Sequence, residues 1–147
     1  MAANETKERL RIAQTSYGSL KGVFGDFGKL CKDVLKGEDG LSIEHSDDTT
    51  LRFKVFDTII SASFSMLFNA EGIPIGMIRF CDDRWDPTES WDLTLYFTKN
   101  GTLLDPDRKI IKESVWDVLH NAFETFLHSS RFEMRDTSSV FSECDMR

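Results

Sequence analysis

The sequence predicts an α+β fold: a long N-terminal helix, then an antiparallel meander sheet of about five to six strands, then a C-terminal helix packed on one face of that sheet. Three observations predict this order. Apolar residues recur every three or four positions near the start, several later runs alternate apolar and polar residues, and an Asp-Pro pair precedes a second helical repeat. No helical repeat separates the strand-like runs, which excludes parallel βαβ units.

The first element is a helix of about seven turns with one continuous apolar stripe. Gly37 and Gly40 supply its end. Four glycines lie inside it, and each costs roughly 1 kcal/mol relative to alanine in a helix interior. We therefore expect packing to hold the helix, and a bend or break near Gly18–Gly25. The stripe consists of Leu10, Ala13, Tyr17, Leu20, Phe24, Phe27, Cys31 and Val34.

The middle of the chain alternates with a period of two residues, as strands do. The third run is the clearest, because apolar residues on one face alternate with Ser61, Ser63 and Ser65 on the other. Turn signals separate the runs, among them Asn69-Ala70-Glu71-Gly72 and Lys99-Asn100-Gly101. The predicted strands are Leu41–His45, Leu51–Val55, Ile60–Phe68, Ile73–Phe80, Trp91–Phe97 and Thr102–Leu104.

The last element is a helix that we expect to begin at Asp105, with Asp105 as its N-cap and Pro106 in its first turn. We expect it to end near residues 128–130. Residues 1–130 then form a single domain, and residues 131–147 form a tail that we expect to be mobile because they lack any clear period. The apolar face of the helix consists of Ile111, Val115, Val118, Leu119, Ala122, Phe123 and Phe126.

Charge and cysteine usage restrict the class of protein. The net charge of −7 argues against direct binding of nucleic acid or an anionic membrane, since both require a cationic surface. Residues 1–36 have seven basic against four acidic residues, whereas residues 37–106 have five against thirteen. Three cysteines without a close pair, and a start that lacks the apolar run of a signal peptide, lead us to expect a cytoplasmic protein.

The most unusual segment is an acidic loop at residues 82–92. Its carboxylates and tryptophans suit partner binding, because tryptophan supplies a buried anchor and carboxylates attract a basic surface. A calcium site is a weaker interpretation, since the positions that an EF-hand reserves for oxygen ligands and glycine hold Trp85, Pro87 and Thr88. A third interpretation is a solvated connection whose tryptophans pack on the core. The predicted partner-binding residues are Asp82, Asp83, Trp85, Asp86, Glu89 and Trp91.

No sequence motif indicates a catalytic or metal centre. His120, Glu124 and His128 recur at intervals of four on the second helix, a spacing that can ligate zinc, but the polar edge of an amphipathic helix explains it as well. The serine row has neither a neighbouring base nor a strained turn. We therefore predict no catalytic residues, no metal and no cofactor.

Together these observations favour a non-enzymatic, acidic protein-binding module of the inhibitor, immunity or chaperone type. Its partner is another protein with a basic surface. The alternative is a small-ligand or enzymatic pocket between the helices and the sheet, lined by Phe53, Phe64, Phe68, Phe97 and Trp116. A homodimer is a further possibility, because the stripe on the N-terminal helix is long enough for a dimer seam.

Overall fold

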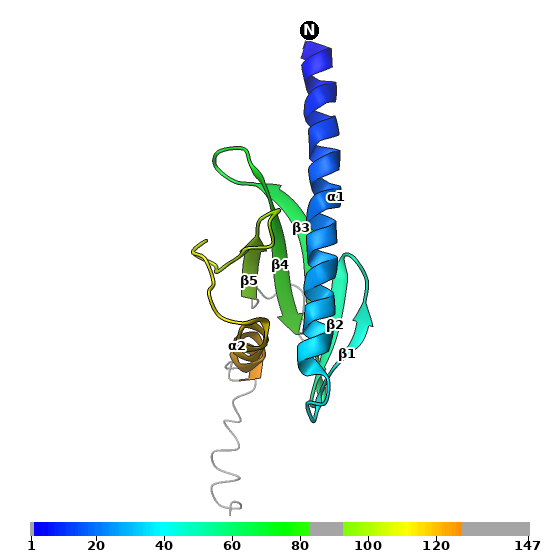
Figure 1. Ribbon diagram of the computed structural model, residues 1–147, viewed down its shortest axis with the longest axis vertical. Coiled ribbons are helices and arrows are strands. Elements are labelled where there is room, and N and C mark those ends of the chain that lie inside the picture. Colours follow the sequence, from blue (N-terminus) through cyan, green and yellow to red (C-terminus); the bar gives the residue numbers. More distant parts are fainter. Residues whose placement is uncertain (1, 83–92, 128–147) are drawn as a thin grey trace, which may run out of the picture.

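The structure, a computed structural model, describes residues 2–82 and 93–127, with side chains from residue 5 onward. It confirms the predicted order of a long helix, a six-stranded antiparallel open sheet and a C-terminal helix (Figure 1). The strands pair only with their neighbours in sequence, in the order β1-β2-β3-β4-β5-β6. The elements are α1 (Ala2–Leu35), β1 (Leu41–Ser46), β2 (Thr50–Val55), β3 (Thr58–Phe68), β4 (Pro74–Asp82), β5 (Leu93–Phe97), β6 (Leu103–Leu104) and α2 (Val115–Leu127).

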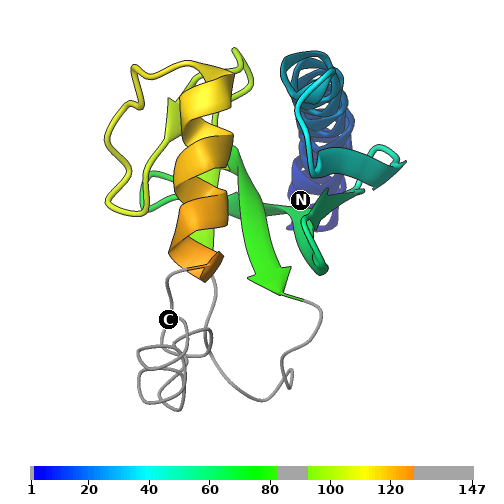
Figure 2. The ribbon, with the colours of Figure 1, turned by 90° about the horizontal axis from the view of Figure 1, so that it is seen from below.

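One face of the sheet carries the core. Strand register places Phe53 opposite Ile60, and alternation then brings the apolar residues of four strands to the same side. Both helices pack on that side and contact each other, and Figure 2 shows them next to one another. Within the described part of the chain no helix covers the opposite face, and Arg52, Lys54 and Ser63 are exposed there. The buried sheet residues include Leu51, Phe53, Val55, Ile60, Ala62, Phe64, Ile78, Phe80, Leu95 and Phe97.

Helix α1 is continuous, so the expected bend or break near Gly18–Gly25 is wrong. Its glycines do not mark a break because Gly18, Gly22 and Gly25 lie on the side away from the core, with open space around them. The sheet covers the helix only from Ser16 onward, and the preceding turns project past the β3–β4 hairpin (Figure 1). Among the described residues, neither helix is both long and apolar enough to cross a membrane.

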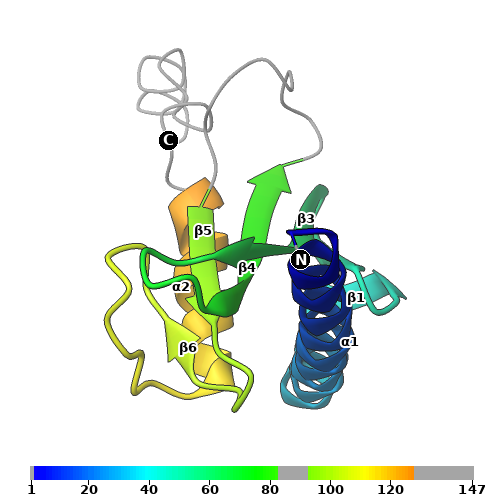
Figure 3. The ribbon, with the colours of Figure 1, turned by 90° about the horizontal axis from the view of Figure 1, so that it is seen from above.

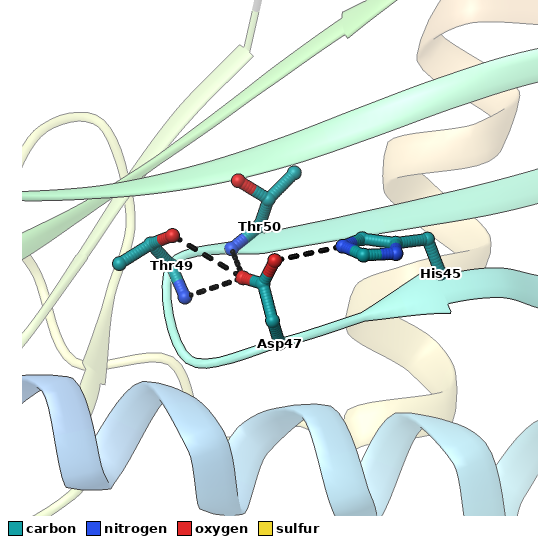
Figure 4. A network of polar contacts seen from close by, with 4 residues as sticks. All are labelled: His45, Asp47, Thr49 and Thr50. Atoms are coloured by element: carbon teal, nitrogen blue, oxygen red, sulfur yellow. Dashed lines mark hydrogen bonds and ion pairs between the residues drawn. The ribbon is translucent and has the colours of Figure 1, made fainter.

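Two of the hairpin turns share one stabilising device: a side-chain oxygen at the start of the turn accepts backbone N–H groups. In the β1–β2 turn, Asp47 Oδ1 accepts from the N–H groups of Thr49 and Thr50, both at 2.8 Å (Figure 4). In the β3–β4 turn, Asn69 Oδ1 accepts two N–H groups at 2.9 Å, and Gly72 supplies the left-handed position at φ 81°. These bonds satisfy polar groups that a sharp turn would otherwise leave unpaired.

Helix α2 begins ten residues after the predicted start, so the assignment of Asp105 as its N-cap is wrong. Asp105 Oδ1 accepts from the N–H groups of Asp107 and Lys109, which closes a tight turn rather than opening a helix. A bridge from Leu104 to Ile110 follows the turn. The helix N-cap is Ser114, whose Oγ accepts from the N–H of Asp117 at 3.2 Å.

Candidate partner-binding surface

The structure describes one of the six predicted partner-binding residues. Asp82 is the last residue of β4 and pairs with Ile60 of β3, so its side chain lies on the inner face and is buried. Asp82 is therefore a sheet residue and not part of an exposed loop. The other five, Asp83, Trp85, Asp86, Glu89 and Trp91, lie outside the described residues.

Most of the described carboxylates of the middle region lie in turns, and Glu44 of β1 is the exposed one on a strand. Strands β2 to β5 contain a single acidic residue, the buried Asp82. Glu38 and Asp39 lie in the α1–β1 turn, and Asp57 lies in the β2–β3 turn. These two turns occupy the end of the sheet at which β4 ends at Asp82 and β5 begins. We call Glu38, Asp39, Phe56 and Asp57 the acidic end.

Phe56 is the aromatic residue of the acidic end, and no periodic pattern in the sequence points to it. It is 55% exposed, and its backbone is left-handed at φ 57°, which is unusual for a bulky residue. Its N–H donates to the carbonyl of Gly40 at 2.8 Å, and its ring lies over Gly40. A Cβ built at Gly40 would lie 2.6 Å from Phe56 Cδ1. A residue without a side chain at position 40 thus gives this ring its place at the surface.

The carboxylates of the acidic end do not stabilise the fold through ion pairs. Glu38, Asp39 and Asp57 are exposed, and within the described part of the chain none of them forms a salt bridge. Glu38 and Asp39 also follow the C-terminus of α1, where the helix dipole disfavours negative charge by about 0.3–1 kcal/mol per group. Their position therefore opposes stability and leaves their charge available to a partner.

A second polar cluster lies at the opposite end of the sheet. His45 Nε2 and Asp47 Oδ2 are 2.7 Å apart in the β1–β2 turn. The N–H of Thr49, the His45 ring and the N–H of Thr50 together hold the pKa of Asp47 well below its ordinary value. All four groups are satisfied by one another (Figure 4), so this cluster serves the turn.

The histidines and cysteines do not assemble a metal centre in the described residues, which contain no group of three or more possible ligands. His120 stacks on Trp116 with ring centroids 6.0 Å apart, and its Nε2 is 3.8 Å from a Glu124 oxygen. His128 lies outside the described residues. Cys31 is buried in the core, and burial raises the pKa of its thiol far above the ordinary value, which suppresses the reactive thiolate.

The aromatic residues of the alternative ligand pocket separate into two groups. Phe53, Phe64 and Phe97 are buried, and the ring centroids of Phe64 and Phe97 are 5.8 Å apart. Phe97 also lines a pocket of about 260 Å³ between α1, the turn that joins β5 to β6 and the first residue of α2. Phe68 is exposed at the end of β3, and Trp116 lies against His120. A shallow groove of about 450 Å³ remains between α2, β5 and residues 105–113.

The chain was compared with protein-family models, with curated proteins and with solved structures, and none of them matches it.

Proposed function

We propose that this protein is a non-enzymatic, cytoplasmic binding module whose acidic end engages a basic surface of another protein. Residues 83–92, which lie outside the described residues, join β4 to β5 along the chain, and their sequence holds four carboxylates and two tryptophans. The end of β4 and the start of β5, between which they run in sequence, lie at the same end of the sheet as Phe56 and Asp57.

The observation that carries the proposal is the exposed ring of Phe56, which lies over Gly40, the residue that follows Glu38 and Asp39, and which precedes Asp57 in sequence. An aromatic side chain surrounded by charged groups has the composition of an interface hot spot with a polar rim. The left-handed backbone of Phe56 is what a two-residue hairpin turn requires at its first position, so the turn itself sets the position of this ring. The unpaired carboxylates add long-range attraction, which raises the association rate with a basic partner.

The test begins with affinity capture from the source cells, followed by purification of the captured partner. Association is then measured by stopped-flow mixing at several salt concentrations. In the test variant, Glu38, Asp39 and Asp57 are all changed to Lys. We expect it to associate at least tenfold more slowly at low salt and to lose most of the salt dependence. A second variant, Phe56→Ser, should mainly accelerate dissociation.

The matched control changes Glu71, Asp107 and Glu113 to Lys, three exposed carboxylates that form no ion pair within the described residues. It shifts the net charge by the same amount at other turns. If the control slows association as much as the test variant does, overall charge governs the encounter. In that case the acidic end is not the binding surface.

A further inference from the structure

The N-terminal part of α1, residues 5–15, forms one wall of an apolar groove, and we call it the projecting half of α1. The stripe of α1 continues toward the N-terminus after the sheet has ended, so Leu10 is 59% exposed; Ile12, outside the stripe, is 53% exposed. Facing them is the end of β3 and its turn, where Phe68 is 52% exposed. The groove between these walls has a volume of about 580 Å³ and is lined mainly by Leu10, Ile12, Ala13, Phe68 and Gly72, with Arg9 at its rim. Figure 3 shows α1 and the β3–β4 hairpin from this end.

The projecting half of α1 has little to hold it as a helix when the protein is alone. A single helical segment shorter than about 12–15 residues is marginal in water. From Glu5 to Thr15 no residue of α1 is buried, whereas from Ser16 onward the sheet supplies packing. A surface that covers the groove would therefore also stabilise this half of the helix.

The exposed apolar area is sufficient for a dimer. Leu10, Ile12 and Phe68 are each more than half exposed, and Tyr17, outside the groove lining, is 38% exposed, which together leaves on the order of 400 Å² of largely apolar surface per copy. Two copies would bury roughly 800 Å² of it. Because apolar atoms make up roughly 60% of a typical interface, the total comes to about 1,400 Å², within the range of stable complexes.

Charge favours a second copy over a strongly charged partner. The chain as a whole is −7, so two copies repel each other over most of their surface. Residues 5–15 are different, because they carry Lys7, Arg9 and Arg11 against Glu5 and Glu8, a net of +1. One of these pairs, Arg11 with Glu8, is already formed within the helix. A nearly neutral, apolar surface offers little to an acidic or basic partner and does not repel itself.

We propose that a second copy of this chain occupies the groove, with the projecting half of each α1 seated against Phe68 of the other copy in a two-fold symmetric dimer. Because the same surface of each copy is used in such a contact, the assembly is complete with two copies and does not grow further. The stripe from Leu20 to Leu35 takes no part, because the sheet already buries it. The groove lies at the opposite end of the sheet from the acidic end, so the dimer leaves that surface open and does not depend on the proposed function.

The test is the mass of the full 147-residue chain in solution, measured by sedimentation velocity from about 1 to about 100 μM, a range that brackets a micromolar dissociation constant. We expect the average mass to rise from 16.9 kDa toward twice that value. The variants L10E and F68E should each weaken association at least tenfold, because each places a charge in the buried centre. Leu10 lies beyond the sheet, so L10E leaves the core intact. An unchanged urea midpoint relative to the natural chain, measured at low protein concentration, verifies this.

The matched controls are L30E and I110E, which change equally exposed apolar residues outside the groove, at 50% and 61% exposure. Both should dimerise as the natural chain does. A second readout is amide hydrogen exchange, in which residues 5–15 gain protection with concentration in the natural chain but not in L10E. A mass of 16.9 kDa at every concentration overturns the proposal. A dimer that L30E and I110E disrupt, but that L10E and F68E leave intact, also overturns the proposal.

Discussion

The ring of Phe97 lies directly over Gly76, its partner across strands β4 and β5. A Cβ built at Gly76 would overlap the ring atoms of Phe97, so the strand pair is fitted to a residue without a side chain. Phe97 is buried and also contacts Phe64 of β3, which ties this pair to the centre of the core.

Gly76→Ala should therefore destabilise the protein although alanine usually suits a strand better than glycine. The added methyl group displaces the Phe97 ring, and overpacking of this kind costs about 1–3 kcal/mol. Urea denaturation at neutral pH measures the loss. The double variant Gly76→Ala, Phe97→Leu should recover part of it, because leucine lacks the ring that clashes. A Gly76→Ala protein as stable as the natural chain would show that the ring has room to move.

Gly22→Ala should have the opposite effect. Gly22 lies within α1 with nothing near the position of an added Cβ, so the substitution gains helix propensity without a clash. We expect a stabilisation of about 1 kcal/mol by the same urea measurement. Unchanged or lower stability would mean that another surface covers this side of α1 in solution.

Asp47 should make the protein acid-sensitive in a defined range of pH. The N–H groups of Thr49 and Thr50 and the His45 ring stabilise its carboxylate, so its pKa is lower when folded than the ordinary 3.8. A lowered folded pKa means that the contribution is complete above about pH 4 and is lost as the pH falls below it. Asp47→Ala should cost about 1 kcal/mol at pH 7. The difference from the natural chain, measured by urea denaturation at several pH values, should shrink below pH 4, whereas a pH-independent difference would contradict this account.

Ser114→Ala should destabilise the start of α2. The Ser114 hydroxyl accepts from the N–H of Asp117 and donates to its carboxylate at 3.1 Å, so alanine leaves that N–H unpaired. The expected cost is about 1 kcal/mol. Ser114→Asp should retain most of the stability, since a carboxylate also accepts this bond. Asp105→Ala provides the comparison. If Asp105→Ala destabilised α2 and Ser114→Ala did not, Asp105 and not Ser114 would be the N-cap of the helix.

Much of the fold was predictable because each element has its own local signal. The stripe of α1, the alternation of β3 and the turn residues Asn69 and Gly72 each follow from sequence period or backbone conformation. The start of α2 was misplaced because Asp105 has the same hydrogen-bonding ability in a tight turn as at an N-cap. Ser114-x-x-Asp117, directly before the buried stretch that starts at Val118, was the better signal.

The candidate site was much less predictable. The charge of Asp82 suggested a loop, whereas the alternation of β4 places it on the same face as Ile78 and Phe80. The structure shows Asp82 on that face, buried at the end of the strand. Phe56 was overlooked because an exposed aromatic residue after a strand has no periodic signature. Only the contact between its ring and Gly40, which joins residues far apart in sequence, reveals its position.

The sequential strand order has a consequence for the way the chain folds during its synthesis. Each hairpin of the sheet brings together residues that are close in sequence, so the strands can assemble one after another as they emerge from the ribosome. Helix α1 emerges first, but Leu20 and Phe24 need strands that are made later. The glycines on its outer side lower the helicity of the isolated segment. The apolar residues of α1 thus do not form a continuous exposed face before the strands are made. This shortens the time during which an amphipathic helix could aggregate with other nascent chains.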